Sequence, residues 1–142
     1  MPRIKFPYRR YPAQPDEAFP NRKNATKPVI PVNLINGSKS FPIYALVDSG
    51  AYATLLSPEL CPVLGIKLED GKESKAIGIS GHEQKTYFHN IQMEVGGYIH
   101  KCYVGFTAGL SVETALLGQQ CFFHHFKKVA FDYNAGEIEI VW

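Results

Sequence analysis

Short apolar runs separated by glycine-bearing turns fill the chain from Pro28 onward. The runs are rich in Val, Ile, Tyr and Phe, the residue types that fit the pleated surface of a sheet. The first run, 29–35, alternates between apolar and polar positions and ends at Asn36-Gly37, a strong hairpin signal, before a second run at 40–47. This pattern predicts a mostly β domain that opens with a hairpin.

Three further strand pairs are expected along the chain. Residues 75–79 and 87–95 flank a glycine-containing tip, and Gly96-Gly97 then turns the chain into residues 98–106. The last pair joins residues 127–133 to the alternating run 137–142. Consecutive antiparallel pairing is therefore the expected organisation.

Two short helices are predicted between these strands. Ser57 followed by Pro58 is typical of a helix start, and Gly65 would close that helix after about Leu64. Apolar residues gather on one side of the segment 119–126, which predicts a second short helix near the C-terminus.

The first 27 residues differ in composition from the rest. They hold five of the ten prolines and carry a net charge of +5, whereas the whole chain of 142 residues carries +2 and the remainder therefore −3. Dense proline prevents continuous helices or ladders. We therefore expect a basic arm at 1–27 and a single folded domain at 28–142, with 45% hydrophobic residues in the chain to build its core.

Compartment and partners can be predicted from what the sequence lacks. No apolar stretch approaches the roughly 20 residues that span a bilayer, and no apolar segment follows the charged N-terminus as in a secretory signal. The expectation is a cytoplasmic protein that does not associate with membranes. A nucleic-acid partner is unlikely, because the folded part at −3 is a poor polyanion surface.

Three cysteines, Cys61, Cys102 and Cys121, are an odd number without a CxxC pair. Such a set argues against a disulfide framework and predicts buried thiols. Cys121 could combine with His124 and His125 as metal ligands, but the sequence shows no second ligand pair at a suitable spacing. We therefore predict neither a metal nor an organic cofactor.

The segment 45–51 carries the candidate chemistry, because an apolar strand ends there in an acid, a hydroxyl and a glycine. Asp48 falls at the end of the predicted strand, Ser49 can fix the loop by hydrogen bonds, and Gly50 lets the backbone approach a substrate or a second copy of the chain. Asp-Ser-Gly alone is a common turn composition, so its flanks must decide.

With those flanks, the sequence resembles the retropepsin family, the single-domain aspartic proteases of retroviral type. Three features carry the resemblance in the expected order: residues 46–51 followed by Leu55-Leu56, the glycine-bearing hairpin 76–81, and Leu116-Leu117-Gly118 before a short helix. The resemblance covers roughly 28–141. It implies a single-domain acid-protease barrel, mostly β, with a flap hairpin and one short C-terminal helix.

The resemblance also implies roles for individual residues. Asp48 would be the catalytic acid, Ser49 would form hydrogen bonds between subunits below the carboxylates, and Gly50 would contact the substrate backbone. The implied substrate-binding residues are Leu46, Ala51, Leu55, Ile77, Gly78, Ile79, Ser80, Gly81 and Leu116. Two positions depart from the family's pattern: Tyr52 and Gln119 stand where an acid and an arginine often pair, and losing both together leaves no unpaired buried charge.

Aspartic-protease chemistry needs two carboxyl groups about 3 Å apart that share a proton. The chain has one Asp-Ser-Gly, and Asp16, Asp70 and Asp132 lack a following Ser/Thr-Gly. A homodimer that cleaves polypeptides is therefore predicted, with the strand 137–142 at its interface. Two alternatives stay open: a non-catalytic peptide- or partner-binding module of the same fold, and a small β-barrel whose arm binds nucleic acid.

Overall fold

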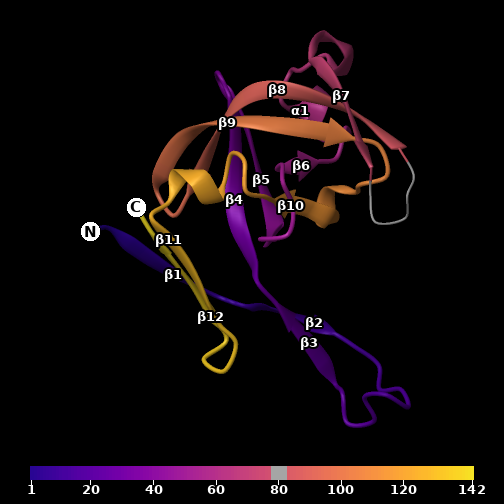
Figure 1. Ribbon diagram of the computed structural model, residues 1–142, viewed down its shortest axis with the longest axis vertical. Helices are drawn as coiled ribbons and strands as arrows, with labels where there is room; N and C mark the ends of the chain where they lie inside the picture. The colour runs from indigo at the N-terminus through magenta and orange to yellow at the C-terminus, as the bar shows by residue number, and fades with distance from the viewer. Residues whose placement is uncertain (78–82) are drawn as a thin grey trace.

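The computed structural model describes residues 1–77 and 83–142 and is dominated by strands (Figure 1). The elements, in chain order, are β1 (Arg3–Pro7), β2 (Arg9–Pro12), β3 (Asn24–Lys27), β4 (Val29–Asn36), β5 (Lys39–Val47), β6 (Leu55–Leu56), α1 (Leu60–Val63), the 3-10 helix η1 (Leu68–Asp70), β7 (Lys72–Ile77), β8 (Glu83–Val95), β9 (Tyr98–Thr107), η2 (Val112–Thr114), β10 (Ala115–Leu117), η3 (Phe123–His125), β11 (Lys128–Asp132) and β12 (Glu137–Val141). In the described residues, no helix is long and apolar enough to cross a membrane.

Six strands close into a barrel. Their hydrogen-bonded order is β4-β5-β10-β6-β9-β8, and a second pairing of β8 with β4 completes the circle, while β7 extends the sheet from β8. The pairs β5–β10 and β6–β9 are parallel, so the chain must cross over between them rather than turn back directly. The prediction of a mostly β barrel is confirmed.

The expected hairpins are present with tight registers. Asn36 pairs with Lys39 across a two-residue turn in which Gly37 adopts a φ of 61°, and Val95 pairs with Tyr98 across Gly96-Gly97. Left-handed φ values of this kind are what glycine allows at little steric cost. Both predicted turns are therefore confirmed.

The core fills the barrel interior with alternating strand positions. From Ile30 to Leu34 on β4 and from Ile99 to Val104 on β9, buried positions alternate with more exposed ones, as expected for strands with one face toward a core. The largest fully buried side chains include Phe106, Phe122, Leu34, Leu56 and Leu117. These strands are thereby held in one register, since a one-residue slip would turn their apolar faces to solvent.

The N-terminal segment is more structured than its prolines suggested. β1 pairs antiparallel with β12, whose other edge pairs with β11, and Ile4 and Phe6 pack against the core. The prediction that residues 1–27 form no ladder is therefore wrong, because prolines 2 and 7 sit at the edges of a strand rather than inside it. Residues 137–142 were predicted to form a strand at the dimer interface. β12 has no free edge for a partner strand, because it pairs with β1 on one side and β11 on the other.

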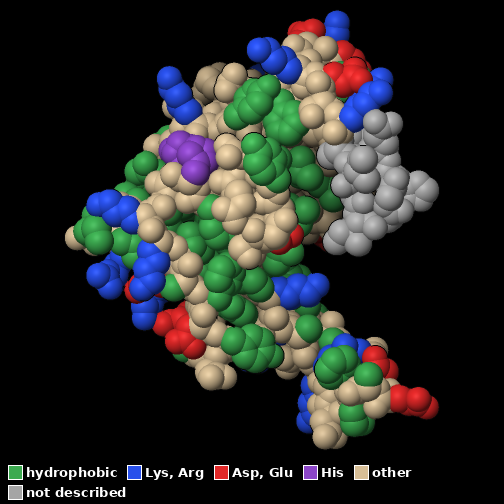
Figure 2. Space-filling view, viewed as in Figure 1, with side chains coloured by type: hydrophobic (Ala, Val, Ile, Leu, Met, Phe, Trp, Pro, Cys, Tyr) green, Lys and Arg blue, Asp and Glu red, His purple; other side chains and the backbone are tan. Residues whose placement is uncertain are grey.

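Beyond β1, the arm forms a hairpin that projects from the body (Figure 1). β2 pairs with β3, from Arg9 opposite Lys27 to Pro12 opposite Asn24. Figure 2 shows the hairpin tip as a separate lobe carrying apolar, basic and acidic side chains. Three of the arm's basic residues form ion pairs within the chain, Arg3 with Glu139, Lys5 with Glu137 and Arg22 with Asp16. These ion pairs reduce the charge available for a polyanion.

The first of the two predicted helices is present, whereas the second is not. α1 ends before Leu64, as expected, but it begins at Leu60 with Glu59 as its N-cap, two residues later than the start predicted at Ser57-Pro58. Ser57 Oγ accepts a hydrogen bond from the Glu59 backbone N–H at 3.2 Å just before the helix. The segment 119–126, in contrast, is a series of turns with the single 3-10 turn η3 instead of a full helix. A residue with positive φ, Cys121 at 77°, interrupts the helical path there.

The cysteines do not all match their prediction. Cys102 on β9 and Cys121 in the turns after β10 form a disulfide, so the expectation of buried thiols is wrong for these two residues. Cys61 is a free, buried thiol, as expected. The odd number of cysteines gave no sign of this pair. Cys102 and Cys121 lie 19 positions apart in the sequence, and only the fold of the barrel brings them together.

Candidate active site

The Asp48 loop begins where β5 leaves the barrel. The backbone N–H of Asp48 donates to the Leu117 carbonyl at 3.0 Å, and its carbonyl accepts from the Ala51 N–H at 3.2 Å. The carboxylate oxygen Oδ1 accepts the Gly50 N–H at 2.9 Å. This contact turns the loop back on the acid and fixes one carboxylate oxygen, while Asp48 itself stays half-buried and Ser49 and Gly50 stay exposed.

The side chain of Thr54 connects the Asp48 loop to the segment that follows β10. Its side chain is fully buried, its hydroxyl donates to the Gln120 carbonyl at 2.9 Å, and the same oxygen accepts the Gly118 N–H at 3.1 Å. Only glycine fits at position 118, because a Cβ there would lie 2.8 Å from the Ala51 carbonyl oxygen and even closer to the Ala53 carbonyl oxygen. The Asp48 loop and the chain after β10 therefore touch backbone to backbone.

Gln119 and Tyr52 occupy the two positions that depart from the family pattern. Gln119 donates its side-chain amide to the Ser49 carbonyl at 2.7 Å and its backbone N–H to the Ala51 carbonyl at 2.8 Å. Tyr52, 76% exposed, accepts the Gln120 N–H through its carbonyl. A neutral amide thus braces the Asp48 loop without an ion pair, and nothing in the sequence alone pointed to Thr54 or Gln119 in this role.

Three predicted pocket residues come together in one row. β10 pairs Leu116 with Leu46 of β5 and with Leu55 of β6, and all three side chains are half-buried. Leu46 and Leu116 also line a groove of about 870 Å³, which runs past Phe41, Tyr44 and Val112 to the base of the arm. The barrel therefore places apolar surface two residues from Asp48 on the same strand.

The remaining predicted residues are placed only in part. β7 and β8 pair as far as Ile77 opposite Glu83, which confirms antiparallel pairing on either side of the predicted hairpin tip. Gly78, Ile79, Ser80 and Gly81, the predicted tip, lie outside the described residues. Ala51 has its carbonyl engaged by the Gln119 N–H and its own N–H engaged by the Asp48 carbonyl, so a contact to substrate would use its methyl group.

The carboxyl inventory bears on what this site can do. Asp16 lies in the loop of the β2–β3 hairpin, Asp70 in η1 and Asp132 at the end of β11, where its Oδ1 accepts the Ala135 N–H at 2.9 Å. Each thus belongs to an element other than the Asp48 loop. Of the four aspartates, Asp48 alone lies in this loop, beside Leu46 of the groove.

Comparison with known proteins now identifies the family. A family model described as "gag-polyprotein putative aspartyl protease" matches residues 33–124, well over half of the chain. The chain belongs to this family of gag-type aspartyl proteases. The matched span runs from β4 past Asp48 to the turn containing Cys121, so it includes the Asp48 loop and its support. No curated protein matches the chain at a significant level.

Solved structures share the fold of this gag-type domain. A retropepsin-like aspartic protease from Rickettsia conorii aligns with a TM-score of 0.62 and 18% identity over 98% of both chains. The retroviral protease-like domain of Ddi1 from Leishmania major gives 0.57 and 14%, covering 82% of this chain and 94% of its own. The EIAV protease bound to the inhibitor HBY-793 gives 0.50 and 20%, covering 66% and 82%. The full-length match with the Rickettsia protein includes the region of the arm.

Proposed function

We propose that this chain is an aspartic endopeptidase, active as a homodimer in which Asp48 of each copy supplies one half of the catalytic pair. The observation that supports this proposal is the Asp48 loop itself: braced by Thr54, Gly118 and Gln119, exposed at Ser49 and Gly50, and present once per chain.

The reaction requires the second copy. Two carboxyl groups held about 3 Å apart cannot both ionise, so one stays protonated and polarises the scissile carbonyl while the other takes a proton from the attacking water. Each chain brings one carboxylate with Oδ1 already held by the Gly50 N–H at 2.9 Å. A two-fold axis between two Asp48 loops would complete the pair, and the shared proton predicts an optimum on the acid side of neutrality.

The substrate is a polypeptide in an extended conformation with apolar side chains near the scissile bond. Leu46, Leu55 and Leu116 give the apolar surface beside Asp48, and the β7–β8 hairpin would close over the peptide to exclude bulk water. Unstructured segments are favoured because a peptide held between a groove and a hairpin must lie extended.

The proposal is tested with Asp48→Asn, which keeps the side-chain size and removes the ionisable group. We expect cleavage of unstructured peptides with apolar residues to fall roughly 10²–10⁴-fold, the usual contribution of a general acid–base group. Asp70→Asn, an exposed carboxylate in η1, is the matched control and should leave the rate unchanged. A statine-type transition-state analogue should inhibit the wild-type protein.

Sedimentation velocity on the same samples separates the possible readings. Loss of cleavage in a dimeric Asp48→Asn protein supports the paired-carboxyl mechanism. If wild-type and mutant proteins are equally inert from acid to neutral pH while both remain dimeric, the chain is a peptide- or partner-binding module of this fold. If active wild-type protein proves monomeric, the two-copy mechanism is wrong.

A further inference from the structure

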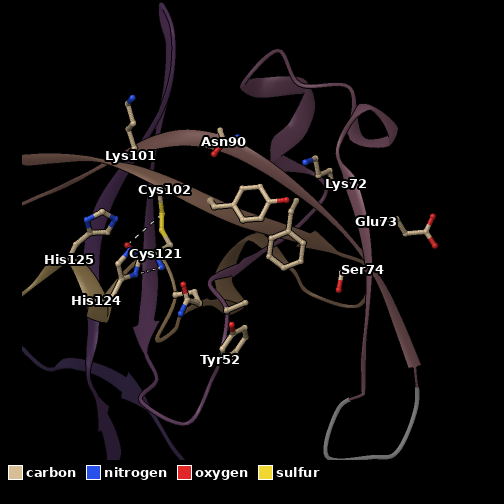
Figure 3. A pocket seen from close by; sticks show the side chains of 14 residues that line it. Tyr52, Lys72, Glu73, Ser74, Asn90, Lys101, Cys102, Cys121, His124 and His125 are labelled. Carbon is tan, nitrogen blue, oxygen red and sulfur yellow. Dashed lines mark hydrogen bonds between the residues drawn. A yellow bond between two sulfur atoms is a disulfide. The ribbon is translucent and has the colours of Figure 1, made fainter.

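A cluster of metal-binding side chains lies inside the barrel, apart from the Asp48 carboxylate. His100, Cys102 and Cys121 are all buried, and their ligand atoms lie within 4.8 Å of one another. His100 and Cys102 share a face of β9 because strand side chains alternate with a period of two. Cys121 reaches Cys102 from the turns after β10 (Figure 3).

His100 lacks the hydrogen bonds that a buried imidazole normally makes. It is 6% exposed, and neither ring nitrogen has a hydrogen-bond partner among the residues that the structure describes. Its ring packs 4.3 Å from that of His125, centroid to centroid. Buried polar atoms normally have hydrogen-bond partners, and a bound metal ion would give one ring nitrogen of His100 a partner.

Cys121 is held in a conformation that presents its side chain to this cluster. Its φ of 77° is rare for a residue with a side chain. Its backbone N–H donates to Nδ1 of His124 at 2.9 Å, and the preceding residue, Gln120, donates to the Tyr52 carbonyl at 2.7 Å. A strained backbone held from both sides points to a role for the side chain it carries.

We propose that the reduced chain binds one Zn²⁺ ion through Sγ of Cys102, Sγ of Cys121 and a ring nitrogen of His100. Two thiolates and an imidazole are the ligand set that zinc prefers, and three protein ligands leave a fourth tetrahedral position for water. The sequence gave no sign of this site. His100 and Cys102 are separated by one residue, but the third ligand, Cys121, lies 19 positions after Cys102.

The disulfide and the zinc site are alternative states of the same two sulfurs. A phosphine reductant opens the disulfide by taking up an oxygen atom from water, giving a phosphine oxide and two thiols. Binding then replaces both thiol protons with the metal, so two protons are released for each Zn²⁺ bound.

The site has a route to solvent and a connection to the Asp48 loop. Cys102 and Cys121 line a groove of about 560 Å³ whose wall also includes Tyr52 and Gln120 (Figure 3). Gln119 and Gln120, directly before Cys121, make the hydrogen bonds that brace residues 49–52. Metal binding would therefore fix the backbone that supports Asp48. The inference does not depend on catalysis, and its tests are spectroscopic.

The decisive measurement uses full-length protein reduced with phosphine, freed of reductant without oxygen and titrated with Co²⁺. We expect one equivalent to give the visible bands of tetrahedral cobalt and a sulfur-to-cobalt charge-transfer band, both abolished by Zn²⁺. Cys102→Ser, Cys121→Ser and His100→Gln should each weaken binding by about 100-fold or more, at least as much as losing a residue that hydrogen-bonds to a metal ligand.

Matched controls distinguish the site from other cysteines and histidines. Cys61→Ala removes the buried thiol whose pKa burial raises to about 11, and His89→Gln changes an imidazole that instead contacts the Leu68 carbonyl at 2.8 Å. Both variants should bind Co²⁺ like the wild type. Where a ligand variant fails to fold, wild-type protein suffices: Zn²⁺ should slow alkylation of Cys102 and Cys121, measured by mass spectrometry, without changing that of Cys61.

Three results would overturn the proposal. Reduced wild-type protein could show no tetrahedral cobalt spectrum, the spectrum could survive in folded His100→Gln and Cys102→Ser proteins, or Zn²⁺ could leave alkylation of Cys102 and Cys121 unchanged. None of these results bears on peptide cleavage, so a failure here leaves the proposed function to its own test.

Discussion

Thr54 shows how a single buried hydroxyl can organise a site that it does not enter. It accepts the Gly118 N–H and donates to the Gln120 carbonyl, and both of those residues belong to the segment that braces residues 49–52. With neither bond, a buried N–H and a carbonyl would have to find other partners or remain unpaired. The geometry of the Asp48 loop thus depends on a residue that lies beneath it.

Thr54→Val tests this dependence at nearly constant volume. The buried Gly118 N–H loses its acceptor, so the free energy of unfolding should fall by about 1–3 kcal/mol in urea denaturation. Thr86→Val is the matched control, because the Thr86 hydroxyl is buried without a hydrogen-bond partner among the described residues and its removal should cost nothing or stabilise the fold. Equal losses in the two variants would refute a specific role for Thr54.

At this scale the sequence pointed to the Asp48 loop but not to the residues that support it. Asp48, Ser49 and Gly50 are consecutive and were proposed from that motif, Leu46, Leu55 and Leu116 were proposed through the family resemblance, and the roles of all six stay predictions. Thr54 and Gln119 could not, since their partners lie 64 to 70 positions away and no local pattern distinguishes them from ordinary polar residues. A single sequence does not reveal contacts between residues that lie far apart in the chain.

Among the elements, hairpins were predictable and crossovers were not. Turns such as 36–39 and 95–98 carry glycine at positions that need it, so their strands could be paired in advance. The parallel pairs β5–β10 and β6–β9 join distant segments and leave no such mark. β1 was missed for another reason: its prolines suggested an arm, whereas both stand at the strand's margins.

Strand β1 covers one edge of β12, and removing it should have a measurable effect. Deleting residues 1–8 would expose that edge together with the apolar surface now under Ile4 and Phe6. We expect the free energy of unfolding to fall by about 2 kcal/mol or more and the protein to self-associate through the open edge, as seen by sedimentation velocity.

A double variant, Arg3→Ala with Lys5→Ala, serves as the control for that deletion. It removes the ion pairs to Glu139 and Glu137 but keeps the strand, and exposed pairs contribute little. Its stability and its mass in solution should stay close to those of the intact chain. If the double variant self-associates like the deletion, charge loss and not the exposed edge is the cause.

For the molecule as a whole, the position of the β2–β3 hairpin bears on the proposed dimer. Val47, next to Asp48, donates its N–H to the Pro28 carbonyl at 2.9 Å, directly after β3. The hairpin therefore leaves the body beside the Asp48 loop, where its Arg9 guanidinium stacks 3.7 Å over the Tyr44 ring. A second chain that brought its own Asp48 to this loop would lie alongside the hairpin.

We accordingly expect the hairpin to strengthen dimerisation. Replacing residues 10–26 with Asn-Gly between Arg9 and Lys27, which already face each other in register, would remove it without stretching the chain. The shortened protein should keep its melting temperature, while its dimer dissociation constant rises at least 10-fold by sedimentation, equivalent to about 1.4 kcal/mol. An unchanged dissociation constant would place the partner elsewhere.

The ends of the chain meet at one margin of the fold, where the Trp142 N–H bonds to the Pro2 carbonyl at 3.1 Å (Figure 1). A larger polypeptide could therefore enter and leave this domain through neighbouring points, with almost no connecting length. Affinity tags on either terminus would emerge together, and the domain could be grafted as an insert into a surface loop of a host protein while its barrel remained intact.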